Sequence, residues 1–125
     1  METLLELDYV TLSYVAEKKC LVQTWKKFCT TEEYKHGQEK SLEFVVAKGC
    51  KGFVSDTTHA GLLKPEATSW AGEVFVPKLK AAGIGNVEVV LPQSAFTKMT
   101  LMSIEKDAVG YMRYYGSLES AMEVL

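Results

Sequence analysis

The sequence has few of the residues that would build a metal site or a disulfide framework. It contains three cysteines, an odd number, and none of them is in a CxxC spacing. We therefore expect Cys20, Cys29 and Cys50 to be reduced thiols that pack as small buried hydrophobic residues, which excludes a structural zinc site and a disulfide frame. This cysteine usage is typical of an intracellular protein, and we expect a cytoplasmic location.

Long runs of positive charge and long apolar runs are also absent. The chain has 14 basic and 16 acidic residues, a formal net charge of -2, and no basic run longer than the lysine pairs at 18–19 and 26–27. This charge pattern excludes a nucleic-acid-binding surface. No apolar run approaches the roughly 20 residues that cross a bilayer, so we expect no stable membrane insertion. The length predicts a single domain over residues 1–125.

Apolar periodicity predicts an opening hairpin followed by a helix. Residues 9–14 alternate apolar and polar side chains, as a strand with one buried face does, and "CLVQTW" (20–25) follows the turn "AEKK" as an antiparallel partner. Thr30 stands three residues before Glu33, which is the spacing of a capping box. A helix is therefore predicted from Thr30 to about Gly49.

The second half of the chain predicts alternating strands and helices. The strand "CKGFVSD" (50–56) precedes a helix with Pro65 in its first turn and Pro77 as a source of distortion. The strand "VEVVLP" (87–92) is predicted to be apolar on both faces, as expected at the centre of a sheet covered by helices. A helix over 94–108, the strand "YMRYYG" (111–116) and a helix capped by Ser117 follow. The predicted fold is α/β: a mixed, mostly parallel sheet with an N-terminal antiparallel hairpin and four helices, in the order ββαβαβαβα.

This order resembles the STAS domain, the sulfate-transporter and anti-sigma-antagonist fold, and most closely its small SpoIIAA-like bacterial members. The resemblance spans nearly the whole chain. Its details are the segment "TTEEY", the strand that ends in Asp56, Trp70 with "AAGI" (81–84), the strand "VVLP" and the terminal "SLESAMEVL". It implies a non-catalytic regulatory module that binds a protein partner, as anti-sigma-factor antagonists do.

In that family a loop after the strand-ending aspartate delivers a D-S-S-G-like segment, with a phosphorylatable serine, to the start of the second helix. Carried over without gaps from Asp56, the segment falls on residues 64–67, where Pro65 and Glu66 stand and no hydroxyl is present. The usual switch position is therefore lost. Glu66 is either an ordinary favourable charge at a helix start or a mimic of a permanently negative switch. The candidate partner-binding residues are Asp56, Thr57, Thr58, His59, Pro65, Glu66 and Ser69.

A catalytic site has a weaker basis. Asp56 and His59 follow the end of a strand, at the edge where open α/β sheets bind ligands. No Ser-His-Asp or HExxH pattern supplies a nucleophile or a second base for them, so we expect a hydrogen-bonded loop pair and no enzyme activity. "AGIGN" precedes a strand, whereas a dinucleotide-binding fingerprint opens a helix, so no cofactor is expected.

The alternative function is a small apolar-ligand or lipid carrier, because STAS-type sheets resemble the lipid-binding lobe of Sec14-like proteins. Phe96, Met99 and Met102 would line a pocket beneath the helix over 94–108; methionines suit such adaptable surfaces but also serve as core fillers. The aromatic strand around Tyr111, Tyr114 and Tyr115 is a candidate for a homodimer interface, with coverage by helices as the other use of these rings.

Overall fold

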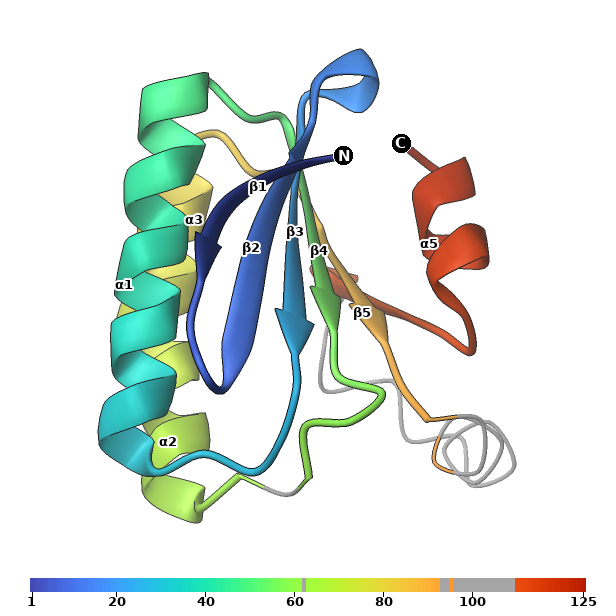
Figure 1. Cartoon of the computed structure of the whole chain (residues 1–125). Helices are drawn as coiled ribbons and strands as arrows, with labels where there is room; N and C mark the ends of the chain where they lie inside the picture. The colour runs from blue at the N-terminus through green and yellow to red at the C-terminus, as the bar shows by residue number, and fades with distance from the viewer. Residues whose placement is uncertain (62, 93–94, 96–109) are drawn as a thin grey trace.

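The structure is a computed structural model that describes residues 1–61, 63–92, 95 and 110–125, and a mixed sheet organises it (Figure 1). The sheet has the spatial order β1-β2-β3-β4-β5-β6, so strands that follow one another in sequence are neighbours. β1 to β3 pair antiparallel and β3 to β6 pair parallel. The strands are β1 (Glu2–Glu6), β2 (Val10–Val15), β3 (Cys20–Trp25), β4 (Gly52–Asp56), β5 (Val87–Val90) and β6 (Met112–Tyr115).

Helices lie on both faces of the sheet (Figure 1). One face carries α1 (Thr31–Lys48) and a continuous helical run of α2 (Pro65–Trp70), a π-helical segment (Ala71–Phe75) and α3 (Val76–Ala81). The other face carries α5 (Leu118–Glu123). Because side chains alternate along a strand, each strand supplies residues to both layers.

Local sequence signals set where these helices begin and end. The Thr30 side chain accepts a hydrogen bond from the Glu33 N–H, and the Glu33 carboxylate accepts from the Thr30 N–H, which confirms the predicted capping box. Gly49 ends α1 in a left-handed conformation with φ of 63°. Pro65 is in the first turn of α2, as predicted, and Ser117 caps α5 by accepting from the Ser120 N–H.

The structure confirms an α/β fold with a mixed sheet and corrects two details. The opening antiparallel unit has three strands, because the unpredicted β1 pairs with β2. The strand β5 is interior but lies next to the edge strand β6, whereas β3 and β4 occupy the centre. The distortion expected from Pro77 is the π-helical segment just before it. The helix predicted over 94–108 lies, apart from Ala95, outside the described residues.

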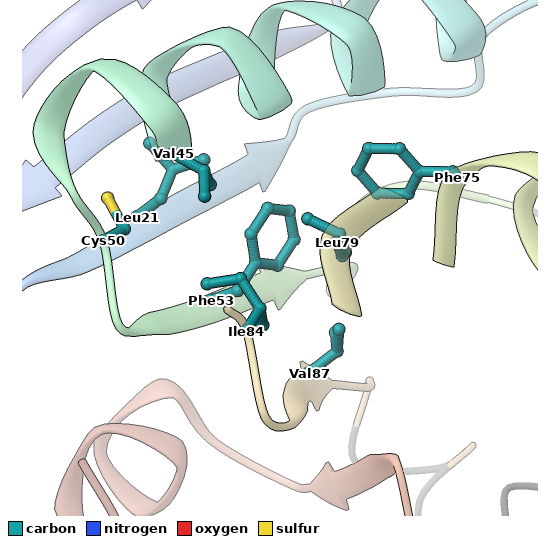
Figure 2. Close-up of a cluster of buried hydrophobic side chains, with 8 residues drawn as sticks. All are labelled: Leu21, Val45, Cys50, Phe53, Phe75, Leu79, Ile84 and Val87. Atoms are coloured by element: carbon teal, nitrogen blue, oxygen red, sulfur yellow. The ribbon is translucent and has the colours of Figure 1, made fainter. Parts of the chain in front are cut away.

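The core between the sheet and α1 to α3 is formed by alternate residues of the central strands (Figure 2). Leu21 pairs with Phe53, and Val87 pairs with Met112, so these side chains form one row across the sheet. Phe75 and Leu79 from the helical run pack onto this row. Burial of this apolar surface is the main favourable contribution to folding.

On the opposite face, a buried carboxylate joins β5 to β6. Glu88 is 1% exposed, and its carboxylate accepts two hydrogen bonds from the Arg113 guanidinium, at 2.9 and 2.7 Å, and one from the Tyr115 hydroxyl at 2.8 Å. Hydrogen bonding to Glu88 also raises the pKa of Arg113. The expectation that "VEVVLP" is apolar on both faces is therefore wrong at Glu88, whose charge is neutralised by its parallel cross-strand partner Arg113.

Gly37 of α1 allows the helix to lie directly against the sheet. A Cβ atom added to Gly37 would be 2.9 Å from Cη2 of Trp25 and 3.3 Å from Val10 Cγ1. Trp25 is 3% exposed and cannot move away without disturbing the core. A side chain at position 37 would therefore push α1 away from β2 and β3.

We predict that Gly37→Ala lowers the free energy of unfolding by about 1–3 kcal/mol through overpacking, although alanine has the higher intrinsic helix propensity. The matched control is Gly72→Ala, because no heavy atom lies within 4 Å of a Cβ at that helical glycine. The control should be unchanged or slightly more stable. Urea denaturation of both variants measures the difference, and equal effects would contradict this account of Gly37.

Candidate functional site

A pocket of about 720 Å³ lies between the sheet and the helical run of α2 to α3. Its walls are mostly apolar, and Lys80 is the one charged residue among the described residues that line it. Volumes of this order are typical of small-molecule sites. The larger apolar side chains of the lining, apart from Trp25 and the tyrosines, are Phe53, Leu63, Phe75, Val76, Leu79, Val87, Val89, Leu91 and Met112.

Polar side chains gather at one corner of the pocket, which we call the polar corner and define as Gln23, Trp25, Gln38 and Ser55. The Gln23 side-chain amide donates to Gln38 Oε1 at 2.5 Å and to Ser41 Oγ at 2.7 Å. The Trp25 indole N–H is shared between Gln23 Oε1 and Ser55 Oγ, each at 3.2 Å. The corner thus connects β3 to both α1 and β4, and each of its side chains is at most 8% exposed.

The register of the sheet explains why polar and apolar parts of the pocket are separated. Gln23 pairs with Ser55, Ser55 with Val89, and Val89 with Tyr114, so these four positions form a row on one face. The polar members stand on β3 and β4, whereas the neighbouring row from Leu21 and Phe53 to Val87 and Met112 is apolar. The pocket therefore changes from polar to apolar along its length.

The π-helical segment shapes the helical wall of the pocket. The Val76 N–H donates to the carbonyl of Ala71, five residues earlier, and Pro77 has no N–H to continue an ordinary ladder. The wider turn brings residues five apart onto the same side: the rings of Trp70 and Phe75 are stacked with centroids 5.9 Å apart. Phe75 also meets Phe53 edge to face at 6.1 Å, which closes the core beneath the pocket.

Cys29 and Tyr34 complete the wall beside the polar corner. The rings of Tyr34 and Trp25 are stacked with centroids 5.3 Å apart. Burial raises the pKa of the Cys29 thiol and of the Tyr34 hydroxyl, so both stay protonated at neutral pH. Cys29 is therefore a poor nucleophile, and all three cysteines are free and buried, as the sequence predicts.

The segment that the sequence singles out lies beyond the carboxyl end of β4. Asp56 Oδ1 accepts hydrogen bonds from the Thr58 N–H at 3.1 Å and the Thr58 hydroxyl at 2.6 Å, and the Thr57 hydroxyl donates to the Val90 carbonyl at 2.6 Å. His59 is exposed, and no bond or ion pair joins it to Asp56 in this fully described segment. The predicted hydrogen-bonded pair of Asp56 and His59 is wrong, because Asp56 closes a turn with Thr58.

The other predicted residues lie on α2. Pro65, Glu66 and Ser69 are exposed there. Glu66 Oε1 accepts a hydrogen bond from the Thr31 hydroxyl at 3.0 Å, which links the first turns of α1 and α2. Thr57 is the one candidate partner-binding residue that also lines the pocket. Phe96, Met99 and Met102, the predicted pocket residues, lie outside the described residues. Tyr111 and Tyr114 line the pocket, which is a use of these rings other than a homodimer interface. A homodimer through this strand stays a prediction.

Sequence reasoning missed the polar corner. Its signal was present, because Gln23 stands between Leu21 and Trp25 on the core-facing positions of β3, and Gln38 and Ser41 are spaced by three on α1. A glutamine in the alternation of a buried strand needs a buried partner. The sequence does not show which positions of the helix face Gln23, because that depends on how α1 packs on the sheet.

Comparisons with known proteins were negative: no family model, no curated protein and no solved structure matches this chain. The SpoIIAA-like assignment stays a prediction from the sequence. Within the described ranges, no helix is long and apolar enough to cross a bilayer. The same ranges contain no group of three or more His, Cys, Asp or Glu side chains that could hold a metal ion.

We predict that Gln23→Leu, which keeps the side-chain volume, lowers the free energy of unfolding by about 2–4 kcal/mol. It removes the two hydrogen bonds that Gln23 donates and leaves the buried Gln38 carbonyl without its donor. The control is Thr24→Val, an isosteric change at the next residue on the opposite face of β3, with an expected effect below about 0.5 kcal/mol. Denaturation curves that place both variants at the same stability would contradict the role given to Gln23.

Proposed function

We propose that this chain is a non-catalytic module with a STAS-like fold that holds a small apolar molecule in the pocket under α2 and α3. The observation that carries the proposal is the pocket itself: about 720 Å³, lined mainly by apolar side chains, with uncharged polar groups at one corner. A few convergent polar groups within apolar walls are the usual composition of small-molecule sites. This is the carrier alternative that the sequence suggests, and the described part of the lining carries it, since Phe96, Met99 and Met102 lie outside the described residues.

The chemistry of the lining favours binding over catalysis. Acid–base catalysis needs a group that ionises near neutral pH within reach of a substrate. The polar corner consists of amides, a hydroxyl and an indole, and the Cys29 thiol is held protonated by burial. Among the described lining residues, Lys80 is the one cation, and its Nζ lies 4.8 Å from the ring centroid of Tyr111.

Val89 offers a direct test, because its half-buried side chain lines the pocket from β5. We predict that Val89→Phe fills part of the cavity and weakens binding of the uncharged fluorescent probe N-phenyl-1-naphthylamine by about tenfold or more. The free energy of unfolding should change by less than about 1.5 kcal/mol, because the added atoms enter existing space. Probe fluorescence and denaturation curves give both quantities.

The matched control is Val46→Phe, the same substitution at a residue of α1 that is 66% exposed and lies outside the pocket. It should leave probe binding unchanged. If Val89→Phe binds the probe as tightly as the unmodified protein, the pocket is not the binding site. If the unmodified protein does not bind the probe at all, the carrier function is wrong.

A second candidate function is the protein-interaction module implied by the STAS resemblance, with the segment from Asp56 to Ser69 as its surface. The observation that favours it is the exposure of Leu63 within this segment, at 37%, and of Phe28 beside it, at 53%. A Cβ atom at Gly61 would be 3.5 Å from Phe28 Cβ, so Phe28 lies against the loop. Exposed apolar groups with a polar surround are typical of interaction sites.

We predict that the double variant Phe28→Ser, Leu63→Ser loses the proteins that copurify with the tagged chain from its own cells, whereas Val46→Ser, at another exposed apolar position, keeps them. Quantitative mass spectrometry of the captured proteins makes the comparison. The interaction surface would be wrong if the double variant retained every partner. Leu63 lines the pocket and Phe28 does not, so the single variant Phe28→Ser should keep probe binding while it loses partners, which separates this function from the first.

A further inference from the structure

The polar corner of the pocket is buried and uncharged. Gln23 is 0%, Trp25 3%, Gln38 5% and Ser55 8% exposed, and none of the four can ionise near neutral pH. Ser41, which supports Gln23 from α1, is also fully buried and uncharged. A molecule that binds at this corner loses its contacts with water. The side chains that it contacts there are polar but carry no net charge, so they cannot neutralise a charged group.

Lys80 is at the opposite end of the pocket. Its ammonium lies over Tyr111, whose hydroxyl donates to the Ile84 carbonyl at the amino-terminal end of β5 and β6. Ser55 and Trp25 stand near the carboxyl-terminal ends of β4 and β3, which run parallel to β5. Lys80 is also exposed to solvent, so it supplies no counter-charge to the polar corner.

The Ser55 hydroxyl retains a proton to donate. Its Oγ accepts from the Trp25 indole N–H at 3.2 Å, and within the described ranges it takes part in no other hydrogen bond. A serine hydroxyl can donate one hydrogen bond while it accepts others. The Ser55 proton is therefore available to an acceptor oxygen of a bound molecule, next to the apolar wall formed by Val89 in the same row.

We infer that the ligand is an uncharged amphiphile: an alkyl or other apolar body that lies along β5 and β6, and a neutral oxygen-containing head, such as an alcohol, ester or amide, that accepts a hydrogen bond from Ser55. This inference rests on the proposed carrier function and specifies its ligand class. The polar corner selects the head, and the apolar row of the sheet holds the body.

The exclusion of charged heads follows from the energetics of desolvation. An ionised carboxylate or ammonium that enters a buried, mostly apolar site loses much of its hydration energy unless a counter-charge compensates it. A neutral oxygen exchanges its hydrogen bonds with water for one to Ser55 at little net cost. Fatty acids and alkylamines should therefore bind more weakly than the corresponding alcohol.

The test uses decanol, decanoate and decylammonium, which share one alkyl length, as competitors of N-phenyl-1-naphthylamine at about pH 8, where both ions are fully charged. Decanol should displace the probe at a concentration at least about tenfold lower than either ion. Because an alcohol is also the most apolar of the three, Ser55→Ala supplies the specific readout: decanol affinity should fall by about three- to tenfold while probe affinity is unchanged. Thr24→Val, on the opposite face of the sheet, is the control.

In Ser55→Ala the Trp25 N–H keeps Gln23 Oε1 as an acceptor, so the fold should persist. If it does not, Ser55→Cys keeps the shape with a weaker donor and should give the same direction of change. The inference is overturned if decanoate or decylammonium competes as well as decanol, or if Ser55→Ala leaves decanol affinity unchanged. With either of these results, displacement of the probe by any of the three competitors would still support the carrier function. If the unmodified protein does not bind the probe at all, both the ligand class and the carrier function are wrong.

Discussion

The buried amide of Gln23 is the interaction on which the arrangement of this protein depends. It projects from the central strand β3, donates to Gln38 and Ser41 on α1, and accepts from Trp25, which in turn reaches Ser55 on β4. A buried polar group of this kind is costly without partners, so α1 is fixed along its axis at the position that satisfies it. The absence of a side chain at Gly37 lets the helix come close enough to do so.

The distribution of charge between the two faces of the sheet gives the pocket its character. The buried carboxylate of Glu88 points to the face that α5 covers, where Arg113 and Tyr115 satisfy it. The neighbouring positions Val87 and Val89 point to the pocket. Strand alternation thus keeps the ion pair of Glu88 and Arg113 away from the pocket and leaves neutral side chains on the sheet side of the pocket. A one-residue shift of β5 would exchange these roles and place Glu88 among apolar side chains.

The sequence predicted those features that depend on neighbours along the chain. Thr30 and Glu33, Pro65 and Ser117 mark helix starts because a cap is a local structure, and their positions agree with the structure. The strand β1 was missed because Leu4 and Leu5 are adjacent, and the register shifts between Thr3 and Leu5, so strict alternation is lost. Its acidic ends also lack the composition of a strand.

The candidate site was harder to predict, because its parts meet only in the folded chain. Gln23, Gln38 and Ser55 come from three elements, and their juxtaposition depends on the parallel pairing of β3 with β4 and on the placement of α1. The π-helical segment follows from the missing N–H of Pro77, but the sequence alone does not decide between a kink and a wide turn. The loop at Asp56 was found readily because clustered polar residues after a strand are visible in sequence.

The indole N–H resonances give the most direct measurement of the central claim that the pocket binds apolar molecules. The protein has two tryptophans: Trp25 is in the polar corner, whereas Trp70 stacks on Phe75 outside the pocket lining. In ¹H–¹⁵N correlation spectra recorded during a titration with decanol, the account predicts a saturable shift of the Trp25 indole signal, together with the backbone signals of Ser55 and Val89, and a smaller shift of Trp70. Saturable binding that leaves Trp25 unmoved, with shifts confined to the exposed surface around Phe28 and Leu63, would contradict it.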